Sequence, residues 1–211
     1  MQNNFQNASA IQTRYSQEAK EEESNLSCGS VLSWANLQAN EIVVDLGCGK
    51  GNEVFKASKF SHYVYGIDFT QEMIDKAKKY QHTNNVQNVE FINGTIDSVP
   101  LYDSIADVVI SNCAINHSSD KSIVYSEIYR ILKPGGRFIV SDIVSQVQLP
   151  EYISNDPQAI AQCYGGAITQ NDYFLAIQQA GFTNIDILHN SLPYEKKGVL
   201  IRSITLKSVK T

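Results

Sequence analysis

A short apolar run ends in an acid and a glycine-dense turn near residue 45, and this stretch has the clearest chemical potential in the chain. The run over 42–44 is followed by Asp45, Gly47, Gly49 and Gly51. This pattern is typical of a buried parallel strand that delivers its carboxyl end to a ligand. Glycines let the backbone pass close to a bound molecule, and the carboxylate suits a cationic ligand better than a pyrophosphate. The spacing fits neither a phosphate loop nor the G-x-G-x-x-G dinucleotide turn.

The next predicted strand, over 63–68, also ends in an acid. Asp68 lies about twenty residues beyond the glycine turn, where α/β nucleotide sites place a carboxylate that accepts hydrogen bonds from the ribose hydroxyls. Its alternative role is to cap the helix predicted over 71–80. Phe69 follows directly, and we expect it either to lie against an adenine ring or to pack in the core.

Strands and helices alternate further along the chain and indicate an α/β fold. The helix predicted over 121–132 ends clearly, because Pro134 cannot continue a helix and two glycines permit a sharp turn. Further strands are predicted over 89–93, 106–111, 137–142, 185–188 and 199–206, and further helices over 8–20, 29–39, 53–59 and 171–180.

Composition excludes several classes of function. The net charge of −5 and the lack of a basic stripe argue against a nucleic-acid partner. No run of eighteen apolar residues is present, so no membrane span is predicted. The first residues lack the pattern of a secretory signal, so we expect a cytoplasmic location and no disulfides. No metal site is predicted, the partner is expected to be a small-molecule substrate, and the oligomeric state is left open.

Two stretches resemble the class I S-adenosylmethionine-dependent methyltransferases, namely Asp45-Leu-Gly-Cys-Gly-Lys-Gly51 and Leu132-Lys-Pro-Gly-Gly136. The resemblance implies a doubly wound, mostly parallel seven-stranded sheet of Rossmann-like type, with S-adenosylmethionine as the cofactor. It also implies that the loop over 94–100 contacts the adenine. The residues expected at the cofactor are Tyr15, Asp45, Gly47, Cys48, Gly49, Asp68, Phe69, Ile96, Asp97 and Asn112.

The same resemblance implies one methyltransferase domain over 1–211 with three parts. Residues 1–40 are expected to form a helical lid, 41–144 the cofactor half, and 145–211 a substrate-side insert with the final strands. We place the insert at 147–168, because this segment interrupts the alternation of strands and helices and is long for a plain connection.

Four further motifs are similar to the arsenite methyltransferase branch: Ser111-Asn-Cys-Ala-Ile-Asn116, Asp120-Lys121, the run 127–136 and Cys163-Tyr-Gly-Gly-Ala167. The resemblance implies a trivalent arsenical as methyl acceptor, held by thiolates, because soft ligands suit a soft centre. The matching thiols are Cys163 and, in the leader, Cys28. This chain departs from the branch in two ways, because a third cysteine is missing near 201–206 and His117 stands where the branch has leucine. Cys113 is expected to be packed only.

Two alternatives stay open. His117 could act as the general base of an O- or N-methyltransferase of a small metabolite, because an oxygen or nitrogen nucleophile usually has to lose a proton, whereas an arsenic lone pair does not. The chain could also be a non-catalytic module that binds S-adenosylmethionine, since a fold alone does not prove activity.

Overall fold

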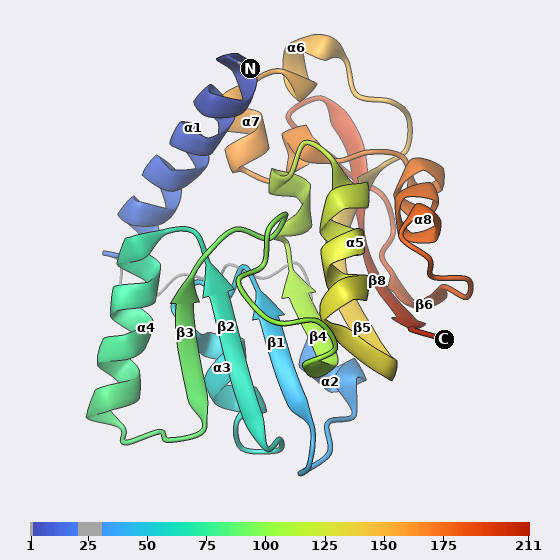
Figure 1. The fold of residues 1–211 in the computed structure, drawn as a ribbon. Helices are drawn as coiled ribbons and strands as arrows, with labels where there is room; N and C mark the ends of the chain where they lie inside the picture. The colour runs from blue at the N-terminus through green and yellow to red at the C-terminus, as the bar shows by residue number, and fades with distance from the viewer. Residues whose placement is uncertain (1, 21–30) are drawn as a thin grey trace.

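A twisted sheet forms the centre of the computed structural model, which describes residues 2–20 and 31–211 (Figure 1). Within these residues the sheet has eight strands in the order β3-β2-β1-β4-β5-β8-β6, with β7 paired to β8. The first five strands are parallel, and β8 is antiparallel to β5, β6 and β7. The strands are β1 Ile42–Leu46, β2 Tyr63–Asp68, β3 Val89–Asn93, β4 Ala106–Asn112, β5 Leu132–Ser145, β6 Asp186–Asn190, β7 Tyr194–Lys196 and β8 Val199–Val209.

Helices cover both faces of the sheet. Side chains of α5 and α8 pack in one core cluster, and those of α2, α3 and α4 pack in another on the opposite face. Because both faces are covered, the central strands read as nearly continuous apolar runs, and Val43, Val44, Val108 and Val109 have no exposed surface. The helices are α1 Gln2–Glu18, α2 Val31–Ala35, α3 Asn52–Ala57, α4 Gln71–Thr83, α5 Lys121–Ile131, α6 Glu151–Ser154, α7 Pro157–Ala161 and α8 Gln170–Gln179, with 3-10 turns η1 Ile115–His117 and η2 Tyr164–Gly166.

A sheet of seven strands was predicted, and the structure adds β7, which was not predicted. β7 and β8 form a hairpin whose two-residue loop is Lys197-Gly198, and both loop residues have positive φ, at 53° and 84°. Positive φ at both positions is the geometry of the tight turn that matches the twist of the strands. Lysine at the first position is not a usual signal for this turn, which explains why the sequence pattern did not reveal the strand.

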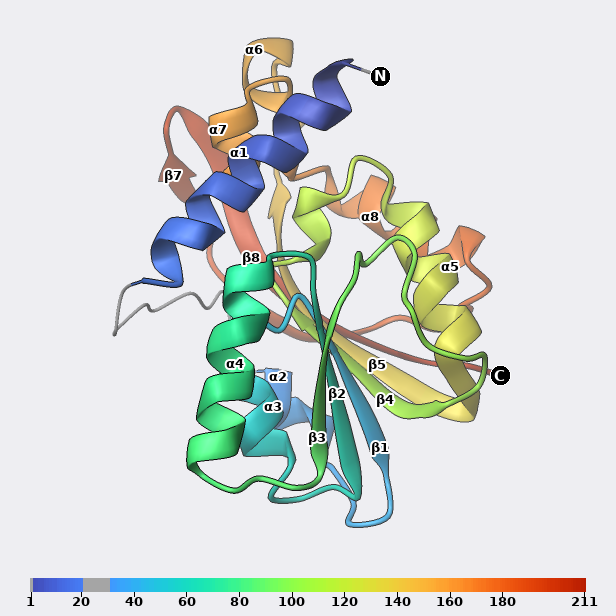
Figure 2. The same cartoon turned by 60° about the vertical axis from the view of Figure 1, so that its left-hand side comes forward.

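The insert forms a closed loop above the sheet. It contains α6, α7 and η2, and its two ends meet where Ser145 forms an isolated bridge with Thr169. The Ser145 N–H also donates to the Ile168 carbonyl at 2.9 Å. Helix α1 lies beside α7 over the carboxyl ends of the parallel strands (Figures 1 and 2). The beginning of the chain and the insert therefore cover the same edge of the sheet.

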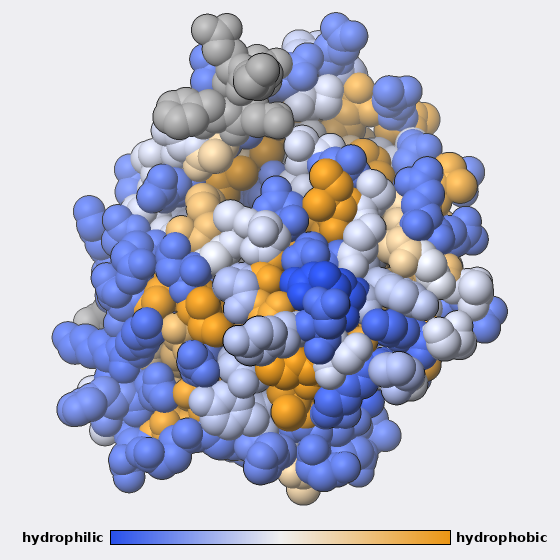
Figure 3. Space-filling view, viewed as in Figure 1, coloured by the Kyte–Doolittle hydropathy of each residue, from blue (hydrophilic) through white to orange (hydrophobic). Residues whose placement is uncertain are grey.

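On the face drawn in Figure 3, hydrophobic residues appear in separate patches among hydrophilic ones. No helix in the described ranges is long and apolar enough to cross a membrane.

Candidate active site

A cavity of about 670 Å³ opens at the carboxyl ends of the parallel strands, beneath α1 and the insert. Its lining includes every predicted site residue that the structure describes, whereas Cys28 lies outside the described residues. The predicted residues in the lining are Tyr15, Asp45, Gly47, Cys48, Gly49, Asp68, Phe69, Ile96, Asp97, Asn112, His117 and Cys163. The fold thus brings together side chains from α1, the first four strands and their loops, η1 and the insert.

Two buried carboxylates give the turn side of the cavity an acidic character. Asp45 is 3% exposed at the end of β1, and burial together with the nearby Glu53 and Asp68 raises its pKa well above the usual value. In the described part of the chain no ion pair reaches Asp45. Burial also raises the pKa of Asp68, while hydrogen bonds from the Thr70 and Gly49 amides oppose that rise. Because both ionised carboxylates are costly here, a cationic ligand would be stabilised at this end.

The three turn glycines have different tasks. A Cβ on Gly47 would lie 2.3 Å from the Ala114 Cβ, and a Cβ on Gly51 would lie 2.6 Å from the Phe91 ring, so these two glycines permit close packing. Only Gly49, with φ of +53°, faces open space within 4 Å. All three glycines were predicted to make room for a ligand. The packing partners of Gly47 and Gly51 could not be predicted, because they are distant in the chain. Gly47 and Gly49 line the cavity and Gly51 does not.

Cys163 is held in a strained turn by the glycines that follow it. Its φ of +69° is unusual for a residue with a side chain. A Cβ on Gly165 would lie 2.5 Å from the Ile160 nitrogen, and one on Gly166 would lie 1.8 Å from the Asn116 carbonyl oxygen. Glycine is therefore required at both positions, because η2 packs backbone to backbone against α7 and η1. The Cys163 motif and the motif that ends in Asn116 are therefore in direct backbone contact.

The Cys163 thiol lies beside His117 and Tyr15. Its sulfur is 3.6 Å from His117 Nε2 and 4.0 Å from the Tyr15 hydroxyl oxygen, which is itself 2.9 Å from His117 Nε2. The other ring nitrogen, Nδ1, is 3.1 Å from the Ile160 carbonyl. Because a carbonyl can only accept, Nδ1 carries the hydrogen and Nε2 accepts from Tyr15.

Burial keeps this group uncharged. It lowers the pKa of His117 to about 4, an effect that the charges of Arg14 and Lys121 strengthen and the bond to Ile160 opposes. It raises the pKa of Cys163 to about 11, with a further rise from Asp142. At neutral pH the pair is accordingly a neutral imidazole beside a protonated thiol.

Cys113 corrects two expectations. It is disulfide-bonded, although no disulfide was expected, and it lines the cavity although it was expected to be packed only. The Cys163 thiol donates to the Cys113 carbonyl at 3.4 Å, so the two cysteines lie on adjacent loops. The signal that could have identified Cys113 is its position directly after the strand β4, at the edge where ligands bind in such sheets.

Cys48 differs from Cys163 in its surroundings. Its side chain is 8% exposed and donates to the Gly49 carbonyl at 3.7 Å, within the turn. No group of three or more histidine, cysteine or acidic side chains in the described residues is placed to hold a metal ion.

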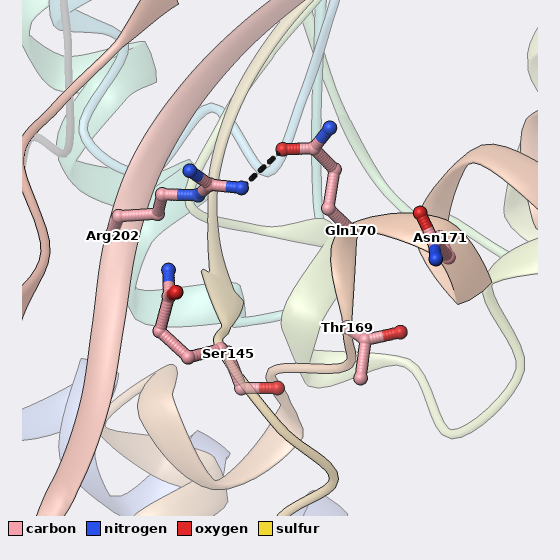
Figure 4. Close-up of a pocket in the computed structure, with 6 residues that line it drawn as sticks. Ser145, Thr169, Gln170, Asn171 and Arg202 are labelled. Atoms are coloured by element: carbon pink, nitrogen blue, oxygen red, sulfur yellow. Dashed lines mark hydrogen bonds between the residues drawn. The ribbon is translucent and has the colours of Figure 1, made fainter.

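A second, smaller pocket of about 170 Å³ lies between β5, β8 and the start of α8 (Figure 4). Arg202 donates to the Gln170 side-chain oxygen there at 2.6 Å. The pocket shares no lining residue with the large cavity and contains none of the predicted site residues.

Comparisons with known proteins point to one family. A model described as a methyltransferase domain matches residues 37–181. The arsenite methyltransferase of Halobacterium salinarum is 38% identical over 165 residues, which cover 77% of this chain and 42% of that protein. The human arsenite methyltransferase is 33% identical over 152 residues, which cover 66% of this chain and 40% of that protein. This chain therefore spans less than half the length of these two curated relatives.

A solved structure gives the same indication. The crystal structure of an arsenic(III) S-adenosylmethionine methyltransferase from Chlamydomonas reinhardtii matches with a TM-score of 0.77 and 28% identity. The match covers 96% of this chain and 74% of that chain.

Proposed function

Because the chain belongs to the methyltransferase domain family, we propose that it transfers a methyl group from S-adenosylmethionine to a trivalent arsenical held by cysteine thiolates. The observation that carries the proposal is the position of Cys163, whose thiol lies in the same cavity as the acidic strand-end turn and beside the loop of Cys113. Arsenic bound to this thiol would lie in the same cavity as the cofactor, with no part of the protein between them.

S-adenosylmethionine is the cofactor of this family, and it supplies a methyl carbon that is already electrophilic. The residues at the turn fit its chemistry. The acids Asp45 and Asp68 lie where a cationic ligand relieves their burial, and the open position of Gly49 leaves room beside the backbone. In this proposal Phe69, Ile96 and Asp97 line the space for the adenine, and Asn112 and Tyr15 border the reacting end of the cofactor.

The thiol side fits a soft acceptor. Cys163 and Cys113 present two sulfur atoms from adjacent loops, and thiolates are the preferred ligands of soft centres. Cys113 can serve only after its disulfide is reduced, so we propose that a reducing thiol is needed for arsenical binding. The family resemblance implied Cys28 as the second sulfur ligand, and Cys28 lies outside the described residues. Once bound, the arsenic lone pair attacks the methyl carbon as the carbon–sulfur bond breaks, and no proton has to move.

The geometry gives little support to the general-base alternative. A pKa of about 4 makes His117 a weak base near neutral pH, and its Nε2 already accepts from Tyr15. We propose instead that His117 shapes the thiol side of the cavity. The lid role of the leader, the small-molecule substrate and the cytoplasmic location are parts of the same proposal.

The deciding experiment is a methyl-transfer assay with radiolabelled cofactor. Wild-type protein is tested against arsenite plus a thiol reductant, and against a panel of small amines, phenols and acids. We expect Cys163→Ser to abolish arsenite methylation while cofactor affinity and the thermal midpoint stay nearly unchanged, because oxygen is a hard donor of similar size. Cys113→Ser should also weaken arsenite binding, because it removes one of the two proposed sulfur ligands.

Cys48→Ser is the matched control, because Cys48 is also buried but lies on the turn side. Any loss of arsenite methylation in Cys48→Ser should be accompanied by weaker cofactor binding, whereas Cys163→Ser should leave cofactor affinity nearly unchanged. Full arsenite activity in Cys163→Ser would contradict the arsenical proposal. Methylation of an amine or phenol that is lost in His117→Ala would establish the general-base alternative, and tight cofactor binding without methyl transfer to any compound would establish the binding module.

A further inference from the structure

Lys121 is a buried cation in an unfavourable place. It is 5% exposed and is the first residue of α5, where the partial positive charge of the helix end repels a cation. Burial lowers the pKa of Lys121 to about 8, although the charges of Asp142 and Asp120 oppose that change. A charged group in such a place persists only when specific contacts compensate for it.

The hydrogen bonds that compensate for the buried charge go to η2 and to the loop that carries η1. The Lys121 ammonium donates to the Gly166 carbonyl at 2.8 Å, and more weakly to the Ser118 carbonyl at 3.5 Å. The buried Asp142 carboxylate accepts from the Asn116 amide at 3.1 Å, on the same loop as Ser118. The ammonium therefore joins η2 to the loop that carries η1, and Asp142 holds that loop from the sheet.

The joined segments determine where Cys163 lies. Gly166 is three residues beyond Cys163 and packs directly on the Asn116 carbonyl. The strained backbone of Cys163 has no cap of its own from a side chain, since η2 begins without a side-chain cap bond. The near end of η2 is held by the Cys163 N–H, which donates to the Ile160 carbonyl at 2.9 Å, and the far end is held by the Lys121 bond to Gly166.

We infer that Lys121 is a positioning residue for Cys163, the thiol that is proposed to bind the substrate. By fixing Gly166 to the η1 loop, Lys121 holds Cys163 in its strained turn. The effect on turnover rests on the proposed function, whereas the effect on the Cys163 thiol does not. Lys121 does not touch the thiol, so it acts through the backbone of Gly166 and, by its charge, on the neighbouring His117.

The test is the rate at which Cys163 is alkylated by iodoacetamide in Lys121→Met, without reductant and with each modified peptide identified by mass. Lys210→Met is the matched control, because Lys210 also donates to two backbone carbonyls, those of Tyr129 and Leu132, but far from the cavity. Buried Cys48 reports in the same sample on opening of the whole fold.

We expect alkylation of Cys163 at pH 8 to rise at least about tenfold in Lys121→Met, because the thiolate is the reactive form and burial suppresses it. If the pKa of Cys163 returned from about 11 to its ordinary value of 9.0, the rise would reach about a hundredfold. Cys48 alkylation and cofactor affinity should stay within about twofold, and Lys210→Met should change neither thiol. Lys121→Arg, which keeps the donors, should return the Cys163 rate toward that of the wild type.

An unchanged Cys163 rate in Lys121→Met overturns the inference, and so does an equal rise at Cys163 and Cys48. If Lys121→Met does not fold, Lys121→Gln is judged by the same two rates. Alkylation needs no arsenical, so a failure of arsenite methylation with the expected alkylation pattern refutes the proposed function and leaves the positioning role in place.

Discussion

Replacing Asp68 by asparagine separates its structural role in the turn from its predicted role in binding the cofactor. The carboxylate accepts from the Gly49 amide at 2.9 Å and from the Thr70 amide at 2.8 Å, one at each oxygen. Asparagine offers one acceptor, so one buried amide would face a donor, at a cost of about 1–3 kcal/mol in the free energy of unfolding. At the cofactor the loss of charge removes a charge-assisted hydrogen bond of about 1.5–3 kcal/mol, which weakens affinity roughly 10- to 150-fold.

Titration calorimetry with S-adenosylmethionine measures the affinity, and a urea unfolding curve measures stability separately. Asp75→Asn is the control, because Asp75 is exposed on α4 and accepts from the Gln71 side chain. It should change neither quantity appreciably. If Asp68→Asn loses stability as expected but binds the cofactor with wild-type affinity, the acid is a structural cap, and the assignment of Asp68 to the ribose is refuted.

Two further outcomes follow from the geometry of the cavity. Gly47→Ala should be about 1–3 kcal/mol less stable to urea than Gly49→Ala, because both positions have positive φ but only Gly47 faces a Cβ at 2.3 Å, and equal losses would contradict the packing role. The folded-state pKa of His117, about 4, lies below the ordinary value of 6.5, so its contribution to stability is complete above about pH 6.5 and is lost as the pH falls toward 4. His117→Leu should therefore lose about 2 kcal/mol less stability than wild type between pH 7 and pH 5, and parallel urea midpoints for the two proteins would show that the buried histidine does not resist protonation.

Local pattern sufficed for the parts of the site that lie at strand ends. The prediction of a doubly wound α/β fold of the class I methyltransferase type is confirmed, apart from the added strand β7. Asp45 and Asp68 could be placed because each ends an apolar run, and parallel strands bring such ends to one edge of the sheet. The segment 147–168 was predicted to be an insert because it breaks the alternation of strands and helices, and it contains α6, α7 and η2.

Contacts between distant segments could not be read from the chain. Gly47 was predicted to make room for the ligand, because its packing partner, Ala114, is more than sixty residues away in the sequence. Cys113 was considered packed and reduced, whereas its loop conformation and disulfide depend on the tertiary fold. Lys121 carried no signal of burial, because its partner Gly166 comes from the insert.

The bridge between Ser145 and Thr169 has a consequence for how such a domain diversifies. Since the intervening segment enters and leaves the sheet at adjacent points, its length can change at a small entropic cost and without moving β5 or α8. This bridge holds both ends of the segment at one place on the sheet. We expect a chimera that keeps residues 2–145 and 169–211 and receives a foreign segment between them to keep the sheet only if that segment also covers Ile143 and Ile201, which the natural insert buries.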